Sequence, residues 1–232
     1  MILYGVGVGP GDPDLVTMGA LRVLDGVDVV FVPVASKGSG SVAGEIYAKL
    51  NPARKTYPFV FPMTEDAPGR DAQILRQIEE YSDLWREAES VALPVIGDAA
   101  LYATVSYLYS AWRGICPALE LRLLPGISAH SLASCAAGEF MALGEERIAI
   151  LPGSADFSKL TEAMSSCDCA ALYKPSALRG DLTKLIDETG PWGRAVRVHR
   201  AGLPEQRIVR GDQAKSPTDD YLSVLLLWRD RD

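Results

Sequence analysis

The chain has 232 residues, of which 48% are hydrophobic and 23% charged, and its net charge is −7. These values exclude a disordered tail, a collagen-like fibre and a small disulfide-stabilised domain. At about 100–200 residues per domain, the length allows one large domain or two small ones. The negative charge disfavours non-specific nucleic-acid binding, which needs clustered Lys and Arg against phosphates. A small anionic ligand held by a few local cations stays compatible with it.

The N-terminal residues and the cysteines together predict a cytoplasmic protein with no membrane span. The chain opens without the basic segment of a signal peptide, and no apolar run reaches the ~20 residues of a transmembrane helix. Cys167 and Cys169 form a C-x-C pair, but neither of the two histidines lies near them. We expect no metal site, because zinc needs four well-spaced ligands, and we expect buried reduced thiols instead.

Short apolar runs alternate along the chain with segments of helical periodicity. The expected strands are 2–8, 28–33, 91–96, 120–124, 147–151, 170–174, 195–200 and 221–228. The expected helices are 14–24, 41–50, 71–89, 101–113, 128–137, 157–164 and 178–188. This alternation predicts an α/β fold with mostly parallel or mixed sheets covered by helices.

The spacing of the strands favours two sheets over one. The clearest break is Gly-Ile-Cys-Pro at 114–117, a group of helix breakers after a long helix. A cut there gives an N-terminal α/β domain of residues 1–116 and a C-terminal α/β domain of residues 117–232. Long connections at 35–40 and 62–69 leave strand ends in the first half, where α/β proteins build binding sites.

A glycine-rich loop, Gly-Val-Gly-Pro-Gly-Asp-Pro at 7–13, follows the first expected strand. A dinucleotide-binding loop would need G-x-G-x-x-G, but in every register the third glycine position holds Pro or Asp. Pro10 and Pro13 lack an N–H donor and Asp12 adds negative charge, which disfavours a phosphate. The loop suits a flat or cationic ligand that approaches the backbone closely. The alternative is that its glycines only let the strand pack against a helix.

Four further strand ends carry loops of their own. Asp98, after Gly97, could accept a hydrogen bond from a ribose or an amine, or could cap the following helix. Ser128, in Pro-Gly-Ile-Ser-Ala at 125–129, is either a helix N-cap or a ligand contact. The last two loops are Leu-Tyr-Lys at 172–174 and Arg-Ala-Gly-Leu-Pro-Glu at 200–205. Each signal is weak by itself, whereas their order and spacing are specific.

Taken in order, these loops resemble those of the tetrapyrrole (corrin/porphyrin) methylase family, from residue 1 to about residue 228. Val-Pro-Val-Ala-Ser-Lys-Gly-Ser-Gly-Ser at 32–41, Phe-Pro-Met-Thr at 61–64 and Glu-Arg-Ile-Ala-Ile-Leu-Pro-Gly at 146–153 resemble one branch in particular. That branch methylates C-20 of precorrin-2 or cobalt-factor II in cobalamin synthesis. The resemblance implies two α/β domains with S-adenosylmethionine in the cleft between them, S-adenosylhomocysteine as product, and a homodimer.

Carried over position by position, the resemblance implies a set of cofactor contacts, several of them through backbone atoms. They fall on Pro10, Gly97, Asp98, Leu101, Ser128, Ala129, Tyr173 and Ala201. Two positions depart from the family pattern. Ala99 replaces the usual proline after Asp98, which we expect to alter the stiffness of the loop without loss of the cofactor. Tyr173 stands where methionine is common.

The implied reaction moves a methyl group from a sulfonium to an electron-rich carbon, so positioning and exclusion of water should dominate. Loss of the C-20 proton afterwards calls for a base. Tyr102 and Asp98 are the candidates, together with His130, which a helix-surface or capping role explains better.

The implied tetrapyrrole substrate carries up to eight carboxylates, so an acidic protein must supply local positive charge. Lys37, beside Ser36 in the loop 36–41, is the strongest candidate to bind them. Lys174 and Arg200 follow strands that border the expected cleft. The alternative for each cation is a solvated surface charge.

Other functions explain less of the sequence. A superfamily methyltransferase for another corrin position, or for a macromolecule such as rRNA or the diphthamide precursor, fits the loops, but the acidic charge disfavours RNA. A nucleotide-dependent reductase lacks its glycine loop. A non-catalytic binding module does not account for five loops at strand ends. Whether the substrate carries cobalt is left open.

Overall fold

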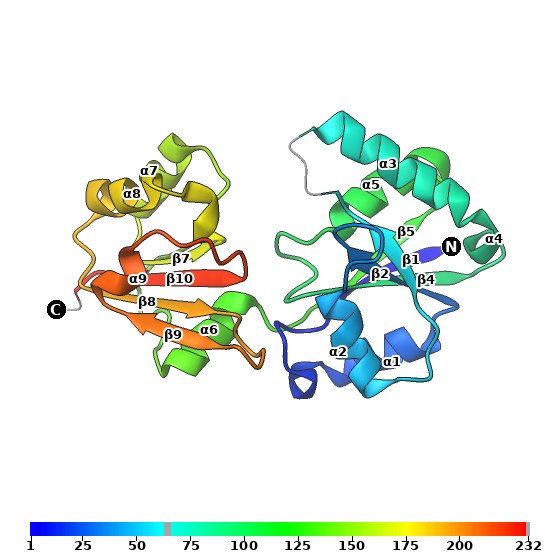
Figure 1. The fold of residues 1–232 in the computed structure, drawn as a ribbon, viewed down its shortest axis with the longest axis horizontal. Coiled ribbons are helices and arrows are strands. Elements are labelled where there is room, and N and C mark those ends of the chain that lie inside the picture. The colour runs from blue at the N-terminus through cyan, green and yellow to red at the C-terminus, as the bar shows by residue number, and fades with distance from the viewer. Residues whose placement is uncertain (63–65, 231–232) are drawn as a thin grey trace. The chain divides into compact units, whose positions relative to one another are not determined.

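The computed structural model describes residues 1–62 and 66–230, which form two compact units, Met1–Ser128 and Ala129–Asp232. Each unit has one five-stranded sheet with helices on both faces (Figure 1). The α/β class with two sheets, one parallel and one mixed, is confirmed. Met63 and Thr64 of the segment 61–64 lie outside the described residues.

The helices and strands follow one another as two alternating series. The first unit contains β1 (Ile2–Gly7), the 3-10 helix η1 (Pro13–Leu15), α1 (Met18–Gly26), β2 (Val29–Val34), α2 (Val42–Leu50), β3 (Tyr57–Val60), α3 (Ala67–Glu80), α4 (Ser82–Trp85), β4 (Ser90–Val95), α5 (Val105–Ile115) and β5 (Glu120–Leu124). The second contains α6 (Ala129–Ala137), β6 (Ile148–Pro152), α7 (Phe157–Ser165), β7 (Cys169–Tyr173), the 3-10 helix η2 (Pro175–Leu178), α8 (Asp181–Thr189), β8 (Arg194–His199), β9 (Arg207–Arg210), α9 (Asp212–Lys215) and β10 (Ser223–Trp228).

The sheet of the first unit is parallel, in the order β3-β2-β4-β1-β5. Helices α1 and α2 cover one face and α3 and α5 the other, so the central strands are buried on both sides (Figure 1). Burial on both sides explains why β2 and β4 are continuous apolar runs. The short strand β3 was not expected, because Pro58 weakens its strand pattern; Gln77 of α3 holds it by bonds to Val60 N and O at 2.7 and 2.8 Å.

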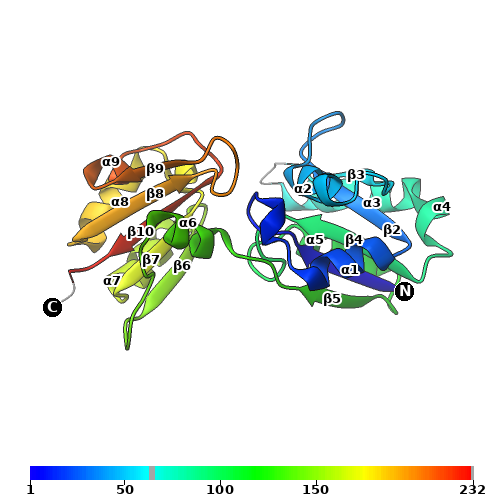
Figure 2. The same cartoon turned by 90° about the horizontal axis from the view of Figure 1, so that it is seen from below.

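The sheet of the second unit is mixed, in the order β6-β7-β10-β8-β9. Strands β6 and β7 are parallel, and β10 runs antiparallel to both of its neighbours. Helices α7 and α8 pack on one face and α6 on the other (Figure 2). This topology places the start of β10 beside the ends of β7 and β8, where Lys174 and Arg200 lie.

The boundary between the two compact units falls after Ser128, whereas the sequence favoured a domain boundary after Cys116. Strand β5 explains the difference, because it pairs with β1 from Ile2 opposite Glu120 to Val6 opposite Leu124. The breakers at 114–117 therefore end α5 and do not end the first sheet.

Several expected helices are shorter than their apolar periodicity indicates. The expected helix 71–89 is divided into α3 and α4 at Tyr81, whose hydroxyl donates to the Pro58 carbonyl at 2.7 Å. The expected helix 101–113 begins only at Val105, because Tyr102 has a φ of 51°. The expected helix 178–188 begins at Asp181, after Arg179 at a φ of 50°.

The four cysteines are free thiols. Cys167 and Cys169 are buried as expected, but Cys135 is exposed on α6 and Cys116 is partly exposed, which corrects the expectation that all four are buried. Within residues 1–62 and 66–230, no helix combines the length and apolar character that crossing a membrane requires.

Candidate functional site

Four glycines meet at the carboxyl ends of β1, β4 and β5. A Cβ atom on Gly7 would lie 2.5 Å from Gly126 N, and a Cβ atom on Gly126 would lie 2.2 Å from Gly97 O. Gly9 and Gly97 exchange backbone hydrogen bonds at 3.2 and 2.8 Å, and both have positive φ values of 71° and 77°. Only glycine allows such close backbone approach at these positions. We call Gly7, Gly9, Gly97 and Gly126 the glycine junction.

The glycine junction fixes the loop that carries Asp98. Asp98 Oδ1 accepts the Ala100 N–H at 2.9 Å, and the Asp98 carbonyl accepts the Leu101 N–H at 3.3 Å. These bonds form a turn, and α5 begins only at Val105, after Thr104. The helix-capping alternative for Asp98 is therefore wrong. Asp98 is half-buried, and an added Cβ on the neighbouring Gly97 would meet only Ile127 O, at 4.0 Å.

Pro10 is buried next to the glycine junction, and Leu101 ends the turn of Asp98. Tyr102 follows with its left-handed backbone and is 48% exposed. Partial burial raises the pKa of the Tyr102 hydroxyl above its usual value of 10.0, so the group is protonated at neutral pH. A protonated phenol can donate a hydrogen bond but cannot take up a proton.

Ser36 and Lys37 lie in a tight turn after β2. Ser39 N donates to the Ser36 carbonyl at 3.1 Å, and Ser36 N donates to Ser39 Oγ at 3.0 Å. Gly38 has a φ of 84°, as the third position of a type II turn requires. Lys37 sits exposed at the tip, with no hydrogen-bond or ion-pair partner among the described residues.

In the second unit, Tyr173 at the end of β7 contacts the first turn of α6. Its hydroxyl accepts the His130 backbone N–H at 3.1 Å and lies 2.8 Å from His130 Nδ1. Ala129 packs against the apolar cluster that contains Ala201, which is buried after β8. The structure thus brings Ala129, Tyr173 and Ala201 to the same end of this unit.

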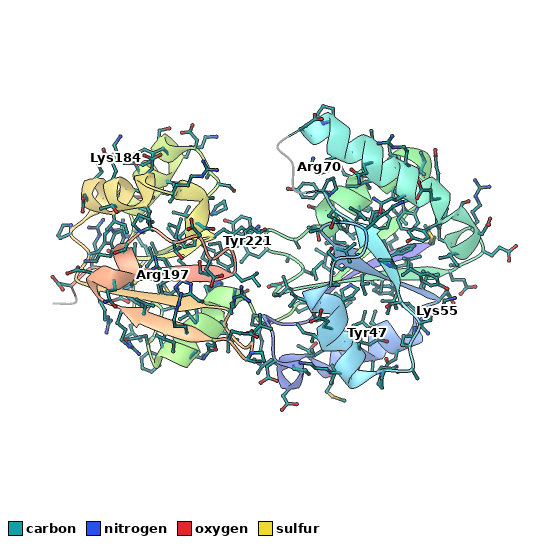
Figure 3. The ribbon with its side chains drawn as sticks, in the orientation of Figure 1. Tyr47, Lys55, Arg70, Lys184, Arg197 and Tyr221 are labelled. Carbon is teal, nitrogen blue, oxygen red and sulfur yellow. The ribbon has the colours of Figure 1, made fainter. Side chains whose placement is uncertain are left out.

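Lys174 and Arg200, which follow β7 and β8, both adopt left-handed backbone conformations, with φ values of 52° and 50°. The Lys174 ammonium lies 4.9 Å from the centre of the Tyr221 ring, a cation–π contact. Arg200 Nε lies 3.6 Å from Asp220 Oδ2. Figure 3 labels Tyr221 at the end of the sheet where β10 begins. The segment before β10 therefore contacts both cations.

A buried polar row behind Arg200 was missed by the sequence analysis. Arg197, which Figure 3 labels, and His199 lie on one face of β8, and Arg197 Nε donates to His199 Nε2 at 3.1 Å. His199 Nδ1 faces Asp220 Oδ2 at 3.4 Å. Burial, then the charges of Arg197 and Arg207, lower the pKa of His199 below 6.5 despite the opposing effect of Asp220. The Arg-Val-His alternation within an apolar strand was the available signal.

The residues of the site determine which kind of ligand it can bind. In the described part of the chain, no three His, Cys, Asp or Glu side chains are grouped as metal ligands. The glycine junction and Asp98 offer close backbone approach and a carboxylate, which suit a ribose or a cation better than a phosphate.

Comparisons with known proteins agree with this geometry. The sequence profile described as Tetrapyrrole (Corrin/Porphyrin) Methylases matches residues 2–215. The "Probable cobalt-precorrin-2 C(20)-methyltransferase" of Methanocaldococcus jannaschii is 31% identical over 98% of this chain and 96% of its own. The "Cobalamin biosynthesis protein CobIJ" of Mycobacterium tuberculosis is 27% identical over 97% of this chain, but the match spans only 45% of that protein, about half its length.

Solved structures share the fold. The uroporphyrin-III C-methyltransferase of Thermus thermophilus, determined with S-adenosylhomocysteine, superposes with a TM-score of 0.70 at 18% identity. The superposition covers 98% of this chain and 97% of that one.

Proposed function

The chain belongs to the tetrapyrrole (corrin/porphyrin) methylase family and is a methyltransferase, and from this premise we propose that it methylates C-20 of precorrin-2 or cobalt-factor II in cobalamin biosynthesis. The observation that carries the proposal is the Methanocaldococcus jannaschii relative, which is named for this position and matches over nearly the full length of both chains. The turn of Ser36 and Lys37, in one of the segments that resemble the C-20 branch, adds support.

S-Adenosylmethionine is the proposed cofactor, and the residues of the first unit fit it. Space is open over Gly97, and the carboxylate of the half-buried Asp98 is an acceptor for ribose hydroxyls. Pro10, Leu101 and Ser128 complete this group in the first unit. In the second unit, the group consists of Ala129, Tyr173 and Ala201. The bound cofactor supplies a methyl group already activated on a sulfonium.

With the methyl group activated, the protein contributes orientation and exclusion of water. The glycine junction packs the backbone at the carboxyl ends of β1, β4 and β5, and the Asp98 turn is held by hydrogen bonds within the protein itself. Lys37, Lys174 and Arg200 are the proposed partners of the substrate carboxylates. Arginine offers a planar fork that matches a carboxylate, whereas lysine offers a point charge.

The proton lost from C-20 needs an acceptor after the methyl group is added. Tyr102 is unsuited, because its raised pKa keeps the hydroxyl protonated. His130 is engaged by the Tyr173 hydroxyl through both its backbone N–H and its Nδ1. Asp98 is the proposed acceptor, directly or through a water molecule.

The protein is further proposed to be a homodimer, as its resemblance to the family implies, and to act in the cytoplasm. Incubation of the protein with S-adenosylmethionine and either cobalt-factor II or metal-free precorrin-2, without oxygen, tests the reaction. Mass spectrometry should show one added methyl group on at least one substrate. A gain on neither substrate would refute the proposal, and the preferred substrate shows whether cobalt is needed.

A further inference from the structure

Asp220, just before β10, occupies an unusual position between two basic side chains of the second unit. Its Oδ2 atom faces both His199 Nδ1 at 3.4 Å and Arg200 Nε at 3.6 Å. Its Oδ1 atom accepts the Leu222 N–H at 3.2 Å, and its carbonyl accepts the Ser223 hydroxyl at 2.7 Å. The carboxylate is therefore tied to the backbone of the segment that leads into β10.

His199 presents a defined face to this carboxylate. A guanidinium only donates hydrogen bonds, so His199 Nε2, which faces Arg197 Nε at 3.1 Å, must be the unprotonated nitrogen. The proton of the neutral ring then lies on Nδ1, which is 3.4 Å from Asp220 Oδ2 but forms no hydrogen bond with it. Arg197 is itself held by the carbonyls of Gln213 and Ser216. The row Arg197, His199, Asp220 is thus oriented from the interior of the unit outward.

Arg200 is the exposed end of this row. Its side chain is 46% exposed, and its backbone is fixed by a bond from Arg200 N to the Leu222 carbonyl at 2.6 Å. Asp220 Oδ2 lies 3.6 Å from Nε, and within the described part of the chain neither terminal nitrogen has a hydrogen-bond partner. The N–H groups of these two terminal nitrogens can donate two parallel hydrogen bonds to the two oxygens of a further carboxylate.

We propose that Asp220, held by the Leu222 N–H and the Ser223 hydroxyl, is a positioning residue that orients the Arg200 guanidinium to bind a carboxylate of the substrate. This inference rests on the proposed function, because the proposed tetrapyrrole supplies the carboxylate. Asp220 acts through Arg200 and does not touch the substrate. The ordered guanidinium loses less rotational freedom on binding, which offsets the repulsion between Asp220 and the anionic ligand.

Two physical effects of removing the Asp220 charge have opposite signs, which makes the inference testable. Asp220→Asn keeps the size and the Oδ1 acceptor for Leu222 N. If Asp220 only repels an anionic substrate, its removal lowers the KM for the tetrapyrrole. If Asp220 positions Arg200, its removal raises that KM about tenfold and leaves the affinity for S-adenosylhomocysteine unchanged. Asp219→Asn is the matched control, since it removes the same charge from the exposed neighbouring residue.

A double-mutant cycle separates positioning from general damage to the fold. Arg200→Lys should raise the KM for cobalt-factor II or precorrin-2, and adding Asp220→Asn to it should raise the KM little further. Additive effects, or a KM in Asp220→Asn equal to or below that of wild type, would overturn the inference. If the wild-type protein turns over neither substrate, the proposed function itself has failed. Thermal unfolding and S-adenosylhomocysteine titration of each variant identify any that are misfolded.

Discussion

The glycine junction provides the sharpest test of how the first unit builds its site. In Gly126→Ala the new Cβ would lie 2.2 Å from Gly97 O and 2.8 Å from Gly7 C. Both neighbours are backbone atoms, so no flexible side chain can move aside. An ordinary contact of 3.4 Å requires the loops to separate by about 1.2 Å, which disrupts the bonds between Gly9 and Gly97.

Overpacking of this kind costs about 1–3 kcal/mol, and we expect the upper half of that range because only backbone can yield. The assay is urea unfolding together with calorimetric titration of S-adenosylhomocysteine. Gly26→Ala is the matched control: nothing lies within 4 Å of its added Cβ, and alanine is the better helix former in α1. If Gly126→Ala unfolds within about 0.5 kcal/mol of wild type and binds the ligand equally well, the junction does not hold the site as described.

Three further predictions concern charged groups. Lys37→Glu should raise the KM for the tetrapyrrole about tenfold without changing the affinity for S-adenosylhomocysteine. Lys49→Glu on α2 is the control and should change neither quantity. An equal loss of tetrapyrrole and S-adenosylhomocysteine affinity in Lys37→Glu would contradict the role of Lys37. Bonds from Arg147 lower the pKa of Asp168 from 3.8 to about 2, so this carboxylate stabilises the fold above pH 3.8 and ceases to do so as the pH falls through about 2. Asp168→Asn should therefore destabilise the protein at pH 7 but not near pH 2 in urea unfolding, and an equal difference at both pH values would refute this. Nuclear magnetic resonance should show that the His199 ring titrates below pH 6.5 and that the neutral ring carries its proton on Nδ1. As the pH drops, the ring takes up a proton in the unfolded chain before it does so in the folded protein, so the free energy of unfolding falls below pH 6.5. A titration midpoint above 6.5, or a neutral ring with its proton on Nε2, would contradict the arrangement of Arg197, His199 and Asp220.

Patterns within single segments predicted most of the fold correctly. Apolar runs such as β4 and β10 are buried on both faces, so hydrophobicity alone locates them. The short strands β3 and β9 were not predicted, because Pro58 in β3 and the arginines at 207 and 210 in β9 interrupt the apolar pattern of a strand. The helix starts at Val105 and Asp181 follow positive φ values at Tyr102 and Arg179, which non-glycine residues seldom adopt.

The candidate site was predictable where it depends on loops at strand ends. Glycines at 7, 97 and 126 marked positions of close backbone approach, and the structure brings them together. The approach of Asp220 to His199 and Arg200 was not predictable, because Asp220 lies some twenty residues after β8 in the sequence. Pairing of β8 with β10 creates this proximity, and no local pattern encodes that pairing.

The position of the transferred methyl group is the most direct test of the proposed function. The protein would be incubated without oxygen with S-adenosylmethionine carrying a 13C-labelled methyl group and with cobalt-factor II or precorrin-2. Carbon nuclear magnetic resonance of the product should show a single labelled methyl group bonded to C-20. A label on any other carbon of the macrocycle, or no labelled product from either substrate, would contradict the assignment.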